Sequence, residues 1–299
     1  MERRRLGKTG MEVSALGLGT SEIGYEHVTQ KQINDLINAA LDAGLNLIDT
    51  AACYGEAEEM VGRAVSHRRS EYHILTKCGH AAGLRLADWS PELVEQSIDR
   101  SLKRLRTDHL DLVQLHSCSE EVLRRGEVTQ ALERERDKGR TRFIGYSGDG
   151  AAAMWAVRSG HFDTLQISVN IADQEAVEGA VAEANLRGLG VIAKRPIANA
   201  AWMPKRSGGI EWYYATYRER LEKLAYGFLF EDATAAVGTA LRFTLSVPGI
   251  HTAIVGTAKP ARWAQNAALL APGKLKPSQY AAIRKRWSAV ADETWTGQR

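Results

Sequence analysis

Cysteine is scarce in this sequence, long apolar runs are absent, and positive and negative charges nearly balance. The 299 residues include three cysteines, Cys53, Cys78 and Cys118, which cannot all pair within one chain. So few cysteines exclude the disulfide framework of a small secreted domain. No run approaches the ~18 apolar residues of a membrane-spanning helix, so we expect no membrane partner. These absences predict a soluble cytoplasmic protein.

The charge balance gives no sign of a polyanionic partner. Lysine and arginine number 39 against 36 aspartates and glutamates, a net charge of +3. That excess is too small to indicate nucleic acid. With 44% apolar and 25% charged residues, the composition is that of a globular protein and not of a collagen-like or disordered chain.

Eight short apolar runs alternate with helical patterns. Most of the runs lack a polar/apolar alternation, which is typical of parallel strands covered on both faces. They are Ala15–Thr20, Leu45–Thr50, Tyr72–Lys77, Leu110–His116, Arg142–Ser147, Thr164–Asn170, Val191–Arg195 and Thr252–Thr257. The helices that we expect between and after them are Thr29–Ala43, Ser90–Arg106, Glu121–Lys138, Ala176–Arg187, Ala233–Ser246, Pro260–Leu270 and Pro277–Ala291.

This alternation predicts an α/β protein built as one (β/α)8 barrel, known as a TIM barrel, over residues 1–299. Residues 1–14 precede the first strand and are expected to form a cap or hairpin. Residues 197–232 form a long segment after strand seven. The alternative is a two-domain dinucleotide-binding protein, but no linker rich in proline, glycine or serine divides the chain.

Two glycine motifs resemble phosphate-binding loops but are incomplete. The run Gly7-Lys8-Thr9 lacks the earlier glycine of a P-loop, because position 2 is glutamate. The run beginning Gly17-Leu-Gly19 lacks the third glycine of a dinucleotide fingerprint. Both interpretations are therefore rejected.

Four chemically active side chains lie at or just beyond the carboxyl ends of three consecutive predicted strands. They are Asp49, Tyr54, Lys77 and His116. Barrels of this type carry catalytic groups at the carboxyl ends of their strands. A tyrosine is a weak acid at neutral pH, and a neighbouring ammonium that favours the phenolate makes it a better proton donor. An imidazole can hydrogen-bond the same carbonyl oxygen. Each residue alone is also consistent with a structural role, but the four together predict proton donation to a carbonyl.

The sequence resembles an aldo-keto reductase from Arg4 to Leu269. The segments that carry the resemblance are Leu6–Ser14, Leu18-Gly-Thr20, Asn46–Ala51 with Tyr54-Gly55, Thr76-Lys77, Asp111–His116, Ile144–Ser147, Gln166–Asn170 and Ile254–Asn266. The resemblance assigns the family's catalytic tetrad to Asp49, Tyr54, Lys77 and His116. It implies that a reduced nicotinamide transfers hydride from C4 to an aldehyde or ketone.

Two positions depart from the family pattern around the nicotinamide. Gly148 stands where most relatives have asparagine, and Lys194 stands where many have a stacking tyrosine. We therefore expect Lys194 or Arg195 to replace the stacking contact. The carboxamide contacts are then expected from Ser147, Gln166 and Asn170.

The remaining cofactor contacts are predicted at the ends of strands one, two and eight. Lys259 and Arg262 lie near a predicted helix start, where cations oppose the helix dipole unless an anion is present. In relatives this stretch holds the adenosine 2′-phosphate, so NADPH (NADP+) is the expected cofactor. The full set of contacts at these strand ends is Gly19, Thr20, Asp49, Gly256, Thr257, Lys259, Arg262, Gln265 and Asn266.

Aromatic residues on the expected rim loops are candidates for the substrate pocket. Tyr25, Trp89 and the stretch around Trp202 and Trp212 join His116 in this prediction, although packing over the barrel would account for these aromatics equally well. The carbonyl substrate stays open among small aldehydes, sugars and hydrophobic ketones, and so does the oligomeric state.

Two alternatives of other classes remain. A zinc site at the three cysteines is conceivable, but neighbouring residues on a strand point to opposite faces, so Cys78 should face the helices if Lys77 faces the rim. We therefore expect no metal. A cofactor-binding regulatory barrel subunit with secondary reductase activity is the other alternative, although the sequence offers no obvious docking segment.

Overall fold

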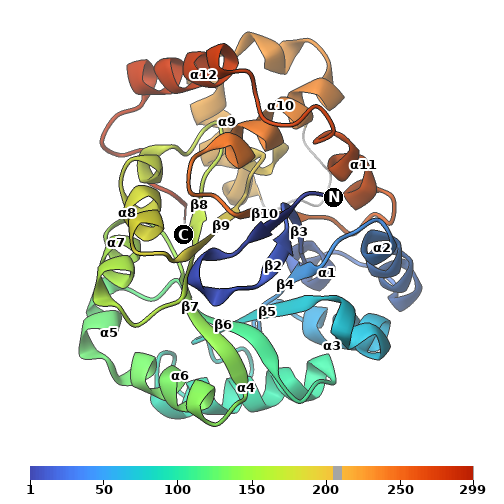
Figure 1. Cartoon of the computed structure of the whole chain (residues 1–299), viewed down its shortest axis with the longest axis vertical. Coiled ribbons are helices and arrows are strands. Elements are labelled where there is room, and N and C mark those ends of the chain that lie inside the picture. The colour runs from blue at the N-terminus through green and yellow to red at the C-terminus, as the bar shows by residue number, and fades with distance from the viewer. Residues whose placement is uncertain (205–210, 299) are drawn as a thin grey trace.

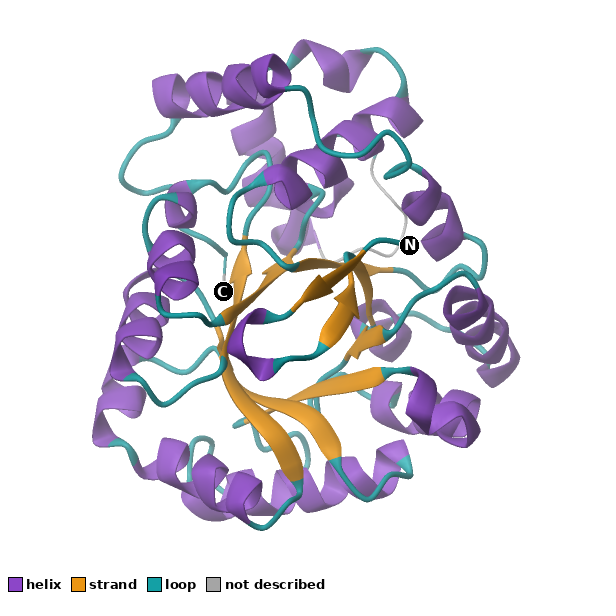
Figure 2. Ribbon diagram, viewed as in Figure 1, coloured by secondary structure: helices purple, strands orange, loops and turns teal. Residues whose placement is uncertain are grey.

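Eight parallel strands close into a barrel at the centre of the molecule (Figures 1 and 2). The computed structural model describes residues 1–204 and 211–298. The strands follow one another around the barrel in chain order, and β10 pairs with β3 to close it. They are β3 (Leu16–Gly19), β4 (Leu47–Asp49), β5 (His73–Cys78), β6 (Leu110–His116), β7 (Thr141–Ser147), β8 (Thr164–Ser168), β9 (Gly190–Lys194) and β10 (Thr252–Gly256). The predicted (β/α)8 barrel is confirmed.

Helices surround the barrel (Figure 2). Those described are α1 (Ser21–Tyr25), α2 (Gln30–Asp42), α3 (Ala57–Val65), α4 (Pro91–Leu105), α5 (Glu120–Arg125), α6 (Glu127–Asp137), α7 (Gly150–Ser159), α8 (Ala180–Leu186), α9 (Glu211–Leu224), α10 (Ala233–Ser246), α11 (Arg262–Ala268) and α12 (Pro277–Val290). Their buried apolar side chains pack on the outward-facing strand residues in one large core.

The barrel interior changes from apolar to polar along the strands. Leu47 and Leu75 belong to an inner apolar cluster of the described residues, together with Leu112, Ile192 and Ile254. Side chains on one face of a strand recur every second residue. Two residues beyond Leu47 and Leu75 therefore stand Asp49 and Lys77, which point into the same interior nearer the carboxyl ends. This two-residue step places the charged groups at the rim.

A hairpin covers the amino-terminal end of the barrel, as predicted for residues 1–14. Strands β1 (Arg3–Arg5) and β2 (Glu12–Ser14) pair antiparallel around a 3-10 turn, η1 (Gly7–Thr9). Leu6, Met11 and Val13 complete the inner apolar cluster. Gly7 has a φ of +51°, and a Cβ there would collide with the backbone of Gly190. The hairpin closes this end with apolar side chains, which leaves the carboxyl-end rim as the place for a polar site.

Three predicted helices differ from the observed ones. The expected helix 121–138 is two helices, because Gly126 adopts a φ of +77° between α5 and α6. The helix expected from Ala176 begins at Ala180, after the 3-10 turn η3 (Glu175–Val177). The helix expected from Pro260 begins at Arg262.

The segment 197–232 holds more regular structure than predicted. It contains two 3-10 turns, η4 (Ala198–Ala200) and η5 (Gly227–Phe230), and the helix α9 between them. Tyr217, Leu221 and Leu224 are buried at helical spacing on α9.

The end of the chain returns to the carboxyl-end rim after α12, and Figure 1 shows the C-terminus projecting near the barrel. Trp295 is buried. The Arg220 guanidinium donates to the Thr296 carbonyl at 3.0 Å, and that of Arg195 to the Gln298 carbonyl at 2.7 Å. No described helix is long and apolar enough to span a bilayer. The prediction that residues 1–299 form one domain stays a prediction.

Candidate active site

A buried ion pair lies at the carboxyl ends of β4 and β5. Lys77 Nζ lies 2.5 Å from Asp49 Oδ2 and donates to the Thr50 carbonyl at 2.8 Å. Both charged residues are only 2% exposed. Gln166 Nε2 donates to the other Asp49 oxygen at 2.8 Å. Because a buried charge is costly unless paired and hydrogen-bonded, these contacts hold the ammonium in one place.

Tyr54 lies directly beside this ammonium. Lys77 Nζ is 5.1 Å from the centroid of the Tyr54 ring. The ring is carried on a tight turn after β4, in which the Tyr54 N–H donates to the Ala51 carbonyl. The next residue, Gly55, has a φ of +48°, and a Cβ there would lie 2.6 Å from the Gly24 carbonyl oxygen. Glycine at this position therefore lets the turn pack closely and fixes where the phenol stands.

His116 completes the predicted tetrad from the end of β6. Its ring centroid lies 5.7 Å from that of Tyr54, with the rings at 78°. Burial, reinforced by the nearby positive charge of Lys77, lowers the pKa of His116 well below its usual value. The imidazole is therefore neutral at pH 7. The structure brings all four predicted residues together at one point on the rim.

A second imidazole, which the sequence analysis missed, borders the tetrad. The His80 ring centroid lies 5.5 Å from that of His116 and 4.8 Å from that of Trp89. His80 Nδ1 lies 3.1 Å from an Asp88 carboxylate oxygen. Gly79 has a φ of +119°, and a Cβ there would collide with the Trp89 ring. The one available signal was that His80 follows Lys77 by three residues in a strand-end loop.

A buried hydrogen-bond chain connects the tetrad to the end of β7. The Ser147 hydroxyl donates to Gln166 Oε1 at 3.0 Å, and the Gln166 amide donates to Asp49. Asn170 does not join this chain. Its amide donates to the Tyr217 hydroxyl, and its oxygen accepts the backbone N–H groups of Ala172 and Asp173. Ser147 and Gln166 therefore offer polar groups at this edge, whereas Asn170 is engaged in a turn.

Packing and pairing account for the residues at the two unusual positions near the expected nicotinamide. A Cβ at Gly148 would collide with the Tyr146 ring, which accounts for glycine there. Lys194 Nζ lies 2.8 Å from Asp149 Oδ2, and burial lowers the pKa of this lysine. The Arg195 guanidinium donates to the Ser168 hydroxyl at 2.8 Å as well as to the Gln298 carbonyl. The stacking role assigned to Lys194 or Arg195 stays a prediction.

The predicted phosphate residues lie where β3 and β10 run side by side. Gly256 pairs with Gly19 in the register of these strands. Thr20 Oγ1 and Arg262 Nε are buried and have no hydrogen-bond partner among the described residues. Lys259 is exposed, and its backbone N–H donates to the Thr257 hydroxyl. Gln265 is exposed and Asn266 is buried nearby on α11. Unused donors and cations in this place are the chemistry that a phosphorylated dinucleotide needs, so the residues fit the predicted cofactor.

The predicted substrate aromatics are not all placed alike. The Tyr25 ring lies 6.1 Å from that of Tyr54, and its hydroxyl donates to the Cys53 carbonyl. The Trp89 ring contacts the His80 ring, which in turn lies beside His116. Trp202 is half-buried against the main core. The side chain of Trp212 lies outside the described residues. Tyr25 therefore borders the tetrad, Trp89 is separated from it by His80, and the pocket role of Trp202 stays a prediction.

The cysteines do not form a metal centre in the part of the chain that is described. Cys78 is buried in the core outside the barrel, as expected from strand alternation. Cys118 is buried in the same core, and Cys53 is half-buried beside His116. The described residues contain no cluster of three histidines, cysteines or carboxylates suited to a metal ion.

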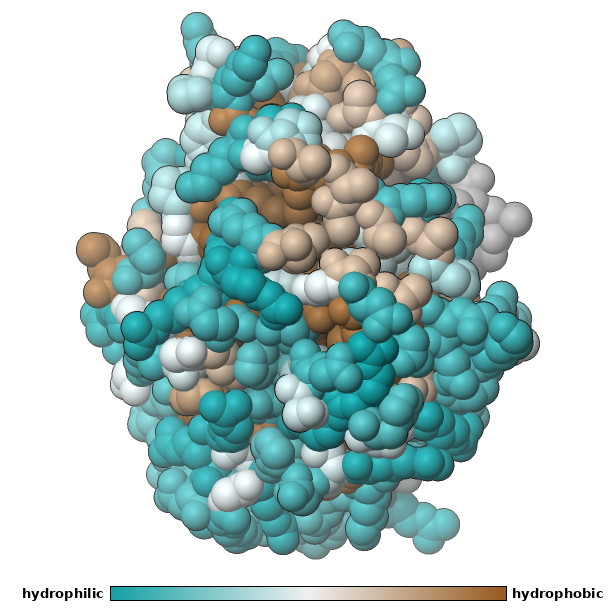
Figure 3. All heavy atoms as spheres, turned by 45° about the vertical axis from the view of Figure 1, so that its right-hand side comes forward, coloured by the Kyte–Doolittle hydropathy of each residue, from teal (hydrophilic) through white to brown (hydrophobic). Residues whose placement is uncertain are grey.

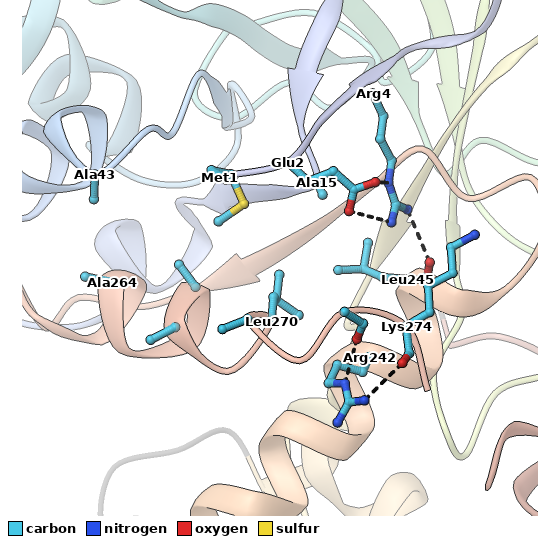
Figure 4. A pocket seen from close by; sticks show the side chains of 14 residues that line it. Met1, Glu2, Arg4, Ala15, Ala43, Arg242, Leu245, Ala264, Leu270 and Lys274 are labelled. Carbon is cyan, nitrogen blue, oxygen red and sulfur yellow. Dashed lines mark hydrogen bonds and ion pairs between the residues drawn. The ribbon is translucent and has the colours of Figure 1, made fainter. Parts of the chain in front are cut away.

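A cavity of about 460 Å³ lies away from this site, between the amino-terminal hairpin and the ends of α10 and α11 (Figure 4). Figure 3 shows apolar surface gathered on this side of the molecule. Several alanines line the cavity. The guanidinium groups of Arg4 and Arg242 donate hydrogen bonds to backbone carbonyls. Glu2, the one carboxylate among the described lining residues, is paired with Arg4 at 2.9 Å, so the tetrad at the rim is the better candidate.

Comparison with known proteins agrees with the geometry. The model of the aldo/keto reductase family matches residues 15–288. The chain belongs to the aldo-keto reductase family. This family membership makes the chain an oxidoreductase and confirms the resemblance found in the sequence.

Individual relatives span nearly the whole chain. An L-galactose dehydrogenase of Arabidopsis thaliana is 29% identical over 285 residues, covering 90% of this chain and 88% of the relative. An aldo/keto reductase of Klebsiella pneumoniae, solved with NADP and acetate, is 26% identical with a TM-score of 0.76 and 95% of each chain covered. An aldo-keto reductase of Bacillus halodurans in its holo form shares the fold, with a TM-score of 0.80 at 23% identity and 98% and 99% coverage.

Proposed function

We propose that this protein is an NADPH-dependent reductase of aldehydes or ketones in which Tyr54 donates the proton. The observation that carries the proposal is the buried Asp49–Lys77 pair, whose ammonium lies 5.1 Å from the Tyr54 ring. The Tyr54 ring in turn lies beside His116, whose pKa is lowered by burial. A fixed cation next to a phenol stabilises the phenolate that proton donation leaves behind.

Each tetrad residue has one task at the carbonyl oxygen. Tyr54 gives this oxygen its proton, and Lys77 stabilises the resulting phenolate. Asp49 and the Thr50 carbonyl hold Lys77 in place. His116 donates a hydrogen bond that orients the oxygen toward Tyr54. The reduced nicotinamide supplies the hydride when it is bound.

The cofactor assignment rests on residues at or after the carboxyl ends of β7, β8 and β10. We infer that Ser147 and Gln166 hold the carboxamide and that Lys259 and Arg262 hold the 2′-phosphate. The buried Arg262 Nε without a partner in the described chain supports this assignment. The Klebsiella pneumoniae relative crystallised with NADP lends support as well. Because NADH lacks this phosphate, NADPH is the preferred cofactor.

The substrate class is best sought among carbonyl compounds that include sugars. The similarity to a dehydrogenase named for L-galactose favours aldoses as one group to test, in both directions of the reaction. The free thiols of Cys53, Cys78 and Cys118 suit the reducing cytoplasm, where we propose that the protein acts.

The test is a screen of small aldehydes, aldoses and hydrophobic ketones with purified protein, in which turnover is measured as the oxidation of NADPH. Turnover of at least one class by the wild type, with preference for NADPH over NADH, is expected. NADPH binding without turnover of any carbonyl class would instead indicate a regulatory subunit and contradict the proposal.

A further inference from the structure

Cys53 makes a contact with His116 that the reaction scheme above does not use. Its Sγ lies 3.4 Å from His116 Nδ1, within hydrogen-bond range for sulfur. Both residues are half-buried. Among the described residues, no other group hydrogen-bonds the His116 ring. The Tyr25 hydroxyl, which donates to the Cys53 carbonyl at 3.2 Å, helps to fix the cysteine backbone.

The direction of this hydrogen bond decides which nitrogen of His116 carries the proton. A neutral imidazole has one N–H and one nitrogen with a free lone pair, and the partner of one nitrogen sets the state of the other. Burial raises the pKa of the Cys53 thiol, so the sulfur keeps its proton at neutral pH. A protonated thiol can donate to a lone pair on Nδ1. The proton of the imidazole is then on Nε2.

We propose that Cys53 is a positioning residue whose thiol donates to Nδ1 of His116 and thereby fixes the tautomer with its proton on Nε2. The functional part rests on the proposed reductase activity, in which this N–H donates to the carbonyl oxygen of the substrate. In the opposite tautomer, Nε2 would present a lone pair to that oxygen and repel it.

The charges around His116 support a neutral, tautomer-controlled imidazole. Lys77 from β5, His80 from the following loop, and Lys194 and Arg195 from the end of β9 all disfavour a proton on this ring. With the imidazolium disfavoured, the ring donates a hydrogen bond through whichever nitrogen holds the single proton. The contact with Cys53 is the feature of the described structure that selects between them.

The experiment reads the tautomer directly. Protein labelled with 15N-histidine is observed by NMR without substrate, because protonated and unprotonated imidazole nitrogens differ widely in chemical shift. The signals of His116 are identified by their loss in His116→Gln. The compared variants are Cys53→Ala, which removes the donor, and Cys53→Ser, which keeps one. Cys118→Ala is the matched control, since that buried thiol makes no hydrogen bond with the His116 ring in the described structure.

The wild type, Cys53→Ser and Cys118→Ala are expected to show the Nε2–H tautomer. Cys53→Ala is expected to show mixed tautomers, a higher His116 pKa, and a kcat lowered about threefold to tenfold, the effect of losing one hydrogen bond. An Nδ1–H tautomer in the wild type, or the wild-type tautomer and pKa in Cys53→Ala, would overturn the proposal. The two proposals fail separately: a wild type with the Nε2–H tautomer but no carbonyl turnover contradicts the reductase alone.

Discussion

The Asp49–Lys77 pair makes a prediction about stability and activity together. Asp49→Asn leaves a buried ammonium with neutral oxygen acceptors and no counter-charge, and Lys77→Met leaves a buried carboxylate without its cation. Removing one partner of a buried ion pair costs about 3–5 kcal/mol of unfolding free energy. Removing both charges leaves no unpaired ion. The double variant should therefore cost about 2–3 kcal/mol less than the sum of the two single variants.

Urea unfolding of the four proteins measures this coupling, provided that the slope of the transition is unchanged. The exposed Lys31–Asp35 pair, which has a similar distance of 2.7 Å, is the matched control, and its coupling should be below about 0.5 kcal/mol. Every variant at Asp49 or Lys77 should lose kcat, the double variant included, because the ammonium is what Tyr54 needs. Additive costs, or a double variant with wild-type kcat, would refute the role assigned to the pair.

Three further predictions follow from other parts of the site. Arg262→Ala should lower the preference for NADPH over NADH about tenfold to a hundredfold, the value of one charge-assisted hydrogen bond, and kcat/KM with both cofactors checks this; an unchanged ratio would count against the phosphate assignment. Because the pKa of His116 is lowered, kcat/KM should show no loss from this group between pH 7 and 6, where an ordinary histidine would begin to titrate. At a pH near the pKa of a free histidine, the folded protein then binds fewer protons than the unfolded chain, so this group lowers the free energy of unfolding as the pH falls through that range. The neutral ring would be contradicted if kcat/KM fell with the pKa of a free histidine and this pH dependence disappeared in His116→Gln. The Arg195 guanidinium, which is predicted to contact the cofactor, donates to the Gln298 carbonyl, so this contact should compete with cofactor binding. Truncation after Thr296 removes that carbonyl and should lower the Kd for NADPH in a fluorescence titration, whereas a higher or unchanged Kd would show that the C-terminal residues do not compete with the cofactor.

The strands could be predicted because most of their residues are buried, whichever face they point to. All eight lie within the predicted runs or extend one residue beyond them, since continuous apolar runs of about four to eight residues are too short for most helices. The tetrad followed from the same pattern. Asp49, Lys77 and His116 each end a strand or stand at its last positions, and parallel strands bring those ends together.

The missed features depend on contacts between residues far apart in the sequence. The hydrogen-bond chain from Ser147 through Gln166 to Asp49 joins three strands, and no local sequence pattern predicts it. His80 lies between Trp89 and His116, and the close packing of Trp89 on position 79 requires glycine there. The break at Gly126 was visible as a glycine, but isolated glycines within helical patterns are often tolerated, so the residue alone could not decide the matter.

The most direct test of the central claim is the turnover of Tyr54→Phe, measured on the best carbonyl substrate together with the Kd for NADPH. Phenylalanine keeps the ring beside Lys77 and removes only the hydroxyl that gives the proton. Loss of a general acid costs about 10²- to 10⁴-fold, so kcat should fall by that factor while the Kd for NADPH stays within about twofold. A Tyr54→Phe variant that reduces the substrate at the wild-type rate would contradict the assignment of Tyr54 as the proton donor.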